Sequence, residues 1–454
     1  MFRKLLVANR GEVAVRIARA AHDAGISVVG VVSTADRDSA WARAFDEVVC
    51  IGGPSPKESY LRIDALVQAA RQTGCAAVHP GWGFLAENPR FAALCGQHGL
   101  TFVGPSPSSM EMMGLKWPAK VAMRAAGLDL TPGSDGLLET VDEAVQSAEA
   151  TGYPVILKAD AGGGGRGMRI CHNAAEVREA FPSARSEALA AFGNGAMFLE
   201  AFITGGRHIE VQVIGDGRGG AIHLFERECS IQRHHQKLIE ESPSPALSED
   251  ERKELGERAA RAAAAIRYAG AGTVEFLSAP GTEKGTRKLT FMEMNTRLQV
   301  EHPVTELVTG IDVVREQLRI AAGGSLGATQ DGVRIEGHAI ECRINAEDPA
   351  DGFKPTPGKI TAFDIPRDAG PGSVRVDTHV EAGESIPPYY DSLVAKVIAH
   401  GRTRDEAIDT MVRCLEGTRI EGISTTIPLH IAVLGSEAFR SGEYDTASIP
   451  GWPA

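Results

Sequence analysis

The chain lacks the features that mark membrane, disulfide-stabilised and nucleic-acid-coating proteins. No apolar run approaches the roughly 20 residues that a membrane-spanning helix needs. The seven cysteines are scattered, odd in number and form no Cys-x-x-Cys pair, which argues against a disulfide framework or a structural zinc site. Basic residues are also outnumbered by acidic ones. The 47 Lys and Arg and the 59 Asp and Glu give a formal net charge of −12. We therefore expect a cytoplasmic protein whose partners are neither nucleic acid nor a membrane.

An export signal is missing from the N-terminus as well. The start, Met1-Phe2-Arg3-Lys4, is basic, but the apolar stretch after it is only about four residues long, too short for a signal-peptide core. We predict a first β-strand at this position.

What is present indicates a large α/β protein. The 454 residues, 43% of them hydrophobic, suffice for about three domains. Residues 4–8 and 27–33 have the character of strands on either side of a helix at 12–24, which indicates a parallel βαβ unit. Changes in pattern near 115 and 333 predict domains at 1–114, 115–333 and 334–454, the later two mixed α+β.

A glycine run occupies residues 162–167. It matches G-x-G-x-x-G, but a strand is predicted after it where the dinucleotide fingerprint needs a helix. Such a loop between strands can cover phosphates with its backbone N–H groups, or it can be a surface hairpin. Lys158, at the end of the preceding strand, favours phosphate binding.

The most informative segment is 293–301. Taken as extended chain, its odd positions form one polar face: Glu293, Asn295, Arg297, Gln299 and Glu301. An edge strand with one wet face remains an alternative. Carboxylates and an amide oxygen, however, suit Mg²⁺, and a guanidinium suits a carboxylate or phosphate.

A second carboxylate supports the metal interpretation. Residues 273–277 and 289–295 form a plausible hairpin, which would bring Glu275 and Glu293 onto one face. Two adjacent carboxylates repel unless a cation or a shared proton relieves them. By contrast, the donor-rich run 232–237 and His208 are equally well explained as a solvated loop and a core histidine.

Taken together, these segments resemble the biotin carboxylase family, within the ATP-grasp fold. The matching stretches extend from residue 3 to about 440 and are 8–12, 79–84, Lys158 with the glycine run, 229–233, 235–237, 293–306, 341–347 and 388–392. The resemblance implies an N-terminal Rossmann-like domain, a central ATP-grasp domain with a mobile glycine-rich lid at about 132–204, and a C-terminal biotin carboxylase domain.

The resemblance also implies a role for each position. ATP would be bound by Lys116, Lys158, Gly164, Gly165, Glu200, Phe202, Ile203, His208, Gln232 and His235, with Glu200 and Ile203 hydrogen-bonded to the adenine edge. Mg²⁺ or Mn²⁺ would be held by Glu275, Glu293 and Asn295. Bicarbonate would be bound by Lys237, Arg297, Gln299 and Val300, Glu301 would be the base, and Arg343 would meet biotin.

The implied reaction is the first half-reaction of an acyl-CoA carboxylase, such as acetyl-CoA carboxylase in fatty acid biosynthesis. Biotin would be carboxylated through carboxyphosphate on a separate carrier protein, because the chain has no Ala-Met-Lys-Met biotinylation motif. Expected partners are the biotin carboxyl carrier protein, carboxyltransferase subunits and a second copy, with Arg19 and Asp23 placed for an intersubunit pair. Alternatives are another ATP-grasp carboxylate–amine ligase, a carbamoyl-phosphate-type synthetase, or a nucleotide-sensing subunit without turnover.

The sequence departs from the family pattern at four positions near the nucleotide: Trp82, Leu115, Ala161 and Ala201. These departures bear on nucleotide affinity and lid motion. None falls within 293–301.

Overall fold

The N-terminal block forms a parallel sheet, as the alternating pattern predicts. The protein is described here by a computed structural model covering residues 2–162, 167–280 and 287–453. The sheet order is β3-β2-β1-β4-β5, and Leu5, Leu6 and Val7 of β1 are fully buried. The elements are β1 (Lys4–Val7), α1 (Gly11–Asp23), β2 (Ser27–Val32), β3 (Glu47–Cys50), α2 (Ile63–Gln72), β4 (Ala77–His79), α3 (Pro89–Gln97), β5 (Thr101–Phe102) and α4 (Pro107–Gly114).

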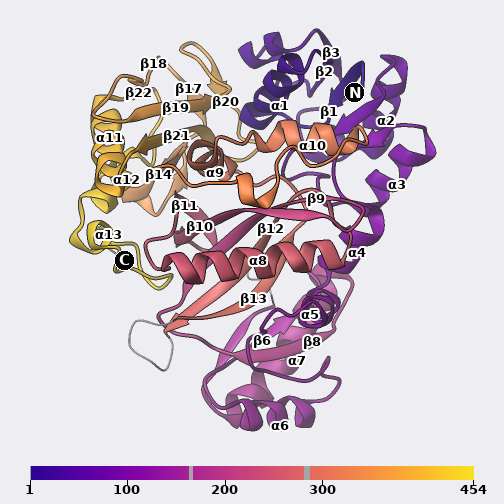
Figure 1. Cartoon of the computed structure of the whole chain (residues 1–454), viewed down its shortest axis with the longest axis vertical. Coiled ribbons are helices and arrows are strands. Elements are labelled where there is room, and N and C mark those ends of the chain that lie inside the picture. The colour runs from indigo at the N-terminus through magenta and orange to yellow at the C-terminus, as the bar shows by residue number, and fades with distance from the viewer. Residues whose placement is uncertain (1, 163–166, 281–286, 454) are drawn as a thin grey trace.

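An antiparallel sheet forms the centre of the molecule, in the order β13-β12-β9-β10-β11-β14-β21-β19 (Figure 1). It is continuous across the predicted boundary near 334, because β14 pairs with β11. On one face, Leu255 and Ala259 of α8 pack against Val211 and Val213. The elements are β9 (Arg207–Asp216), β10 (Ala221–Arg233), β11 (Gln236–Ser242), α8 (Glu249–Ala265), β12 (Ala269–Pro280), β13 (Arg287–Asn295), α9 (His302–Thr309), α10 (Val313–Ala321), β14 (His338–Asn345), β19 (Ser373–Thr378) and β21 (Leu393–Gly401).

A smaller lobe lies below the central sheet in Figure 1 and has its own core. Its sheet, in the order β7-β6-β8, is covered by α6 and α7, and α5 precedes it in the chain. The elements are α5 (Lys116–Ala125), α6 (Val141–Thr151), β6 (Val155–Ala159), β7 (Arg169–Cys171), α7 (Ala174–Phe192) and β8 (Met197–Ala201). A strand thus follows the glycine run, as expected.

The last block packs α11 and α12 against β14 and β21 around a separate apolar cluster. Its remaining elements are short strands and C-terminal helices: β15 (Glu347–Asp348), β16 (Lys354–Pro355), β17 (Gly358–Lys359), β18 (Ala362–Asp364), β20 (Ser385–Ile386), α11 (Arg404–Gly417), β22 (Arg419–Glu421), α12 (Ile427–Gly435) and α13 (Glu437–Ser441).

One prediction was wrong. Residues 293–301 are not a continuous strand, because β13 ends at Asn295 and α9 begins at His302. Between them, Leu298 and Val300 are buried, but so are Gln299 and Glu301. The period-two pattern therefore does not separate a wet face from a dry one there.

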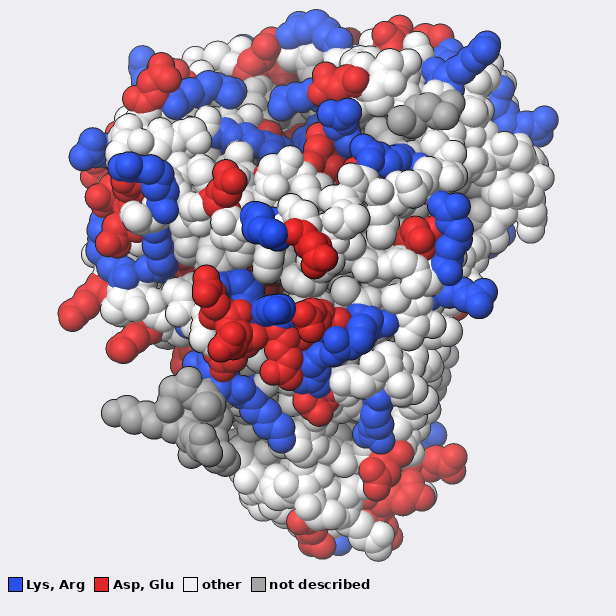
Figure 2. Space-filling view, in the orientation of Figure 1, with Lys and Arg blue, Asp and Glu red and all other residues white. Residues whose placement is uncertain are grey.

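The surface carries charges of both signs. In Figure 2, acidic and basic side chains intermingle along α8, where Glu254 lies 3.9 Å from Arg258 and Glu257 lies 3.7 Å from Arg261. Within the described ranges, the helices are all too short or too polar to cross a membrane. The seven cysteines are free thiols, and Cys229 and Cys342 are fully buried.

Candidate active site

A cavity of about 430 Å³ lies between the central sheet, the smaller lobe and the C-terminal block. Phe202 and Ile203 lie at the end of β8 and do not line it, and Glu301 lies behind its wall. The predicted Gly164 and Gly165 fall outside the described residues. The predicted residues that line the cavity are Lys116, Lys158, Glu200, His208, Gln232, His235, Lys237, Glu275, Glu293, Asn295, Arg297, Gln299, Val300 and Arg343.

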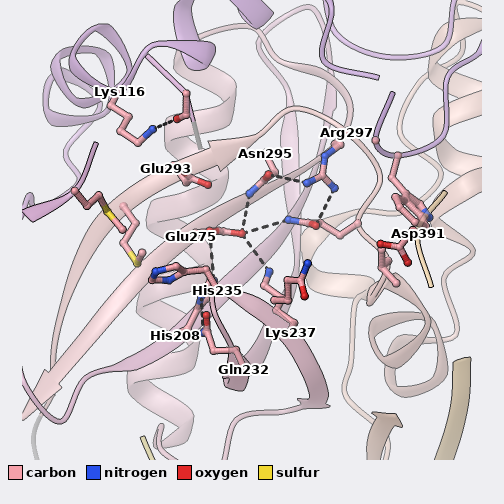
Figure 3. A pocket seen from close by; sticks show the side chains of 18 of the residues that line it. Lys116, His208, Gln232, His235, Lys237, Glu275, Glu293, Asn295, Arg297 and Asp391 are labelled. Atoms are coloured by element: carbon pink, nitrogen blue, oxygen red, sulfur yellow. Dashed lines mark hydrogen bonds and ion pairs between the residues drawn. The ribbon is translucent and has the colours of Figure 1, made fainter. Parts of the chain in front are cut away.

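The predicted pairing of Glu275 with Glu293 is observed. The two residues face each other across β12 and β13, and Asn295 Nδ2 donates to Glu275 Oε1 at 2.7 Å (Figure 3). Burial would raise the pKa of Glu275, but Lys237 and His208 outweigh it and hold that pKa far below its usual value. Burial and the charge of Glu275 raise the pKa of Glu293. The two carboxyls are therefore a repelling pair that a cation would relieve.

The donor set at this pair fits a hard divalent cation. Carboxylate oxygens and an amide oxygen are ligands that Mg²⁺ accepts. His208 Nε2 lies 3.4 Å from Glu275 and 3.6 Å from Glu210. Burial lowers the pKa of His208, but these carboxylates raise it to about 9. A protonated imidazole has no lone pair free for a metal, so His208 serves as a cation near the cavity.

A buried carboxylate, Glu301, lies between two cations and shares one of them, Lys237, with Glu275. Glu301, with 0% of its surface exposed, is 2.6 Å from Lys237 Nζ and 2.9 Å from Arg343 Nη2. Burial would raise the pKa of Glu301, but Lys237 and Arg343 are among the charges that lower it. Glu301 is therefore ionised at neutral pH and able to accept a proton.

Arg297 sits beside this carboxylate and is held by several acceptors. Its Nη1 donates to Gln299 Oε1 at 3.0 Å, its Nη2 to Asn295 Oδ1 at 3.1 Å, and its Nε to Glu87 Oε2 at 3.0 Å. The guanidinium of Arg297 is thus held in a fixed orientation beside the cavity, where it can bind an anion without a rearrangement of the site.

Two lysines bind the carboxylate of Glu200. Lys120 Nζ donates to Glu200 Oε1, and Lys158 Nζ lies 2.6 Å from Oε2. Because these lysines occupy its side chain, Glu200 would make the expected hydrogen bond to adenine with its main chain. Leu115 gives α5 no side-chain cap, and Asp160 Oδ1 accepts from the Trp117 N–H at the start of that helix, at 2.7 Å.

His235 lies in a tight two-residue turn at the edge of the cavity. β10 and β11 form a hairpin whose two connecting residues, His234 and His235, have φ of 48° and 65°. This left-handed conformation is uncommon for residues other than glycine, but His adopts it more readily than most, as Asn and Asp do. Both histidines are exposed, and His235 borders the cavity, where its ring is open to a ligand.

Several residues of the site were missed by sequence reasoning. Lys120 lies on α5 among ordinary helix residues and gives no signal of its own. Glu210 lies two residues after His208 on β9 and binds Lys237 at 2.5 Å. Residues two apart on a strand point to the same face, so the predicted role of His208 could have indicated Glu210 as a site residue. Glu240 binds Arg343 Nη2 at 2.5 Å from the neighbouring strand β11, which only the strand pairing reveals.

Comparison with known proteins identifies the family. The biotin carboxylase N-terminal domain matches residues 1–110, the ATP-binding domain of the carbamoyl-phosphate synthase L chain matches 116–329, and the biotin carboxylase C-terminal domain matches 341–450. Biotin carboxylase 1 of Bacillus subtilis is 51% identical over 446 residues, 98% of each chain.

Two solved structures agree over nearly the same length. The biotin carboxylase–β-γ-ATP complex of Campylobacter jejuni is 45% identical with a TM-score of 0.93, and 98% of each chain is covered. The biotin carboxylase domain dimer of Hydrogenobacter thermophilus 2-oxoglutarate carboxylase, in complex with MgADP, ADP and bicarbonate, is 46% identical with a TM-score of 0.92. It covers 98% of this chain and is itself 96% covered. The chain has the ATP-grasp fold and belongs to the biotin carboxylase family.

Proposed function

We propose that this chain uses ATP and bicarbonate to carboxylate biotin carried on a separate protein. The observation that carries the proposal is the buried carboxylate of Glu301 between Lys237 and Arg343. It places a proton acceptor and two cations beside one cavity. The cations can bind anionic bicarbonate and the negative charge that develops on biotin. This is the arrangement that bicarbonate activation and biotin deprotonation require.

ATP would lie at the end of the cavity formed by Lys116, Lys158 and His208, whose charges face the phosphates. Gln232 and His235 border the same space, while Glu200, Phe202 and Ile203 would hold the adenine, and Gly164 and Gly165 would cover the phosphates. We propose that the segment at about 132–204 closes over them, which would exclude water from a reactive intermediate. Glu275, Glu293 and Asn295 would hold Mg²⁺ or Mn²⁺, which when bound would offset phosphate charge.

Bicarbonate would be bound by Lys237, Arg297, Gln299 and the Val300 backbone. Glu301 would take the bicarbonate proton as an oxygen of bicarbonate bonds to the γ-phosphorus. The bond to the β–γ bridging oxygen then breaks, and ADP leaves. Because Glu301 is held ionised, it is ready to act before ATP reacts.

Biotin would enter at the end marked by Arg343. Carboxyphosphate would break into CO₂ and phosphate, the phosphate would take the proton from biotin N1, and N1 would bond to CO₂. The guanidinium of Arg343 would stabilise the negative charge on the ureido oxygen during that transfer.

The test is release of ADP that requires bicarbonate and rises with free biotin. Glu301→Ala should lower kcat by about 100-fold or more, the size of a lost general base, and Arg343→Ala should remove the response to biotin. Arg261→Ala, at an exposed position on α8, should keep wild-type rates. Unchanged biotin-stimulated turnover in both site variants would contradict the proposal, as would ADP release that depends on ammonia or an amino acid and ignores biotin.

We further propose that the protein acts in the cytoplasm, where its free thiols stay reduced. Its partners would be a biotin carboxyl carrier protein and carboxyltransferase subunits of an acyl-CoA carboxylase, and it would form a homodimer. Arg19 and Asp23 are exposed on α1, where they are free to meet a second copy. Light scattering at micromolar concentration should give about twice the chain mass; the mass of a single chain would rule the dimer out.

A further inference from the structure

The stretch 296–301 is held by one local contact and by two contacts from distant parts of the chain. It is neither strand nor helix, so side chains must bind its polar backbone groups. Glu87 Oε1 accepts from the Thr296 N–H at 2.9 Å, and His302 Nδ1 lies 2.7 Å from the Gln299 carbonyl oxygen. The Val300 carbonyl oxygen accepts from Lys396 Nζ at 2.9 Å.

Lys396 is an ammonium group in the protein core. It lies on β21 opposite Arg343 of β14, and none of its surface is exposed. Burying an ammonium is costly unless it is paired and hydrogen-bonded. Glu12 Oε2 at 3.1 Å and Asp377 Oδ2 at 4.0 Å supply opposite charge. Lys396 therefore serves these carboxylates and, in addition, supplies the donor for the Val300 carbonyl oxygen.

Glu12 links this ion pair to the cavity wall. It lies on α1, within the family-like segment 8–12 for which no role was assigned, and is buried. Its other oxygen, Oε1, accepts from Trp82 Nε1 at 3.0 Å, and Trp82 lines the cavity. The N-terminal helix and the loop that carries Trp82 are therefore linked through Glu12 to the ammonium that binds the Val300 carbonyl oxygen.

We propose that Lys396, paired with Glu12, is a positioning residue that holds the backbone of Gln299–Glu301 in the shape that binds bicarbonate. The inference rests on the proposed function. Lys396 is not among the described residues that line the cavity, so it acts through Val300. Without the ammonium, the buried Val300 carbonyl loses its donor. The peptide then turns toward another donor and draws the Glu301 carboxylate away from Lys237 and Arg343.

The experiment compares Lys396→Met with a matched control, Arg404→Met. Arg404 is also a largely buried cation on a buried carboxylate, Glu241, but it does not border the cavity. KM values for bicarbonate, ATP and biotin are measured separately. Lys396→Met should raise the KM for bicarbonate by about tenfold, the loss expected for one hydrogen bond to a charged group. The KM for ATP should stay within about twofold. Arg404→Met should change neither, and Lys396→Arg should recover part of the loss.

Glu12→Gln keeps the inference testable if Lys396→Met does not fold. It preserves shape and removes the counter-charge, so it should raise the KM for bicarbonate more than the KM for ATP. Equal changes in both constants, or no change in a folded variant, would overturn the inference. Wild-type protein without biotin-dependent turnover would instead overturn the proposed function, so the two failures are distinct.

Discussion

At the scale of single residues, the geometry of Arg343 depends on a carboxylate that sequence reasoning did not single out. Its Nε and Nη2 both lie within 2.6 Å of Glu240 Oε1, and its Nη2 also reaches Glu301. Arg343 itself could be predicted, because a family-like segment surrounds it. Glu240 could not, because its role exists only through the pairing of β11 with β14.

Glu240→Gln should therefore weaken biotin binding. The neutral amide loses the ion pair that orients Arg343, and the KM for biotin should rise by about tenfold. Burial raises the pKa of Glu240 to about 7, against the opposing effect of Arg343. In the wild type the KM for biotin should thus rise as the pH falls through about 7, and the variant should lack that rise.

Glu341→Gln is the matched control for this prediction. Glu341 lies directly opposite Glu240 on β14 and is fully buried. Burial raises its pKa well above the usual value, which favours the neutral form that glutamine mimics. Equal effects of both substitutions on biotin would show that the sheet, and not the Arg343 contact, is what matters.

At the scale of elements, the sequence predicted strands and helices better than the segments between them. The helix predicted at 12–24, observed as α1, and the pairing of β12 with β13 follow from periodicity and from turn residues, which are local signals. The segment 293–301 was misread because its polar residues alternate by chance with apolar ones. Its real shape is set by the distant Glu87 and Lys396 together with the neighbouring His302. The contacts of Glu87 and Lys396 join residues far apart in the sequence, which leaves no periodic pattern.

The edge where α11 meets the central sheet should give the protein a measurable acid sensitivity. Burial would raise the pKa of Glu241, but hydrogen bonds from His338 and Arg404 outweigh it and lower the pKa to about 2. A carboxyl whose folded pKa lies below its unfolded value stabilises the fold above that unfolded value, about 4.3, and loses this contribution as the pH falls toward 2.

Glu241→Gln should accordingly lower the thermal midpoint at pH 7 and flatten its further fall between about pH 4.5 and pH 2. The comparison is Glu179→Gln, an exposed position on α7, which should follow the wild type across the range. If the thermal midpoints of Glu241→Gln and the wild type changed in parallel with pH, Glu241 would not be the source of the acid sensitivity.

At the scale of the whole molecule, the site exists because three regions meet. The central sheet is continuous from β13 to β19, and so it brings Arg343 from the last block beside Glu301 from the middle one. The N-terminal block contributes Glu12 and Glu87 to the same place. The sequence predicts the three regions, but it does not predict the ion pairs between them. Ion pairs between distant residues follow from packing and not from a local sequence pattern.

The most direct test of biotin carboxylation measures the transfer of isotopic label from bicarbonate to biotin. Purified protein is given isotopically labelled bicarbonate, ATP, Mg²⁺ and free biotin, and the products are separated under alkaline conditions that preserve carboxybiotin. If the chain carboxylates biotin, ATP-dependent label should appear in biotin, grow in proportion to ADP and be lost in Arg343→Ala. ADP released without label in biotin, or label transferred to ammonia in its place, would contradict biotin carboxylation by this chain.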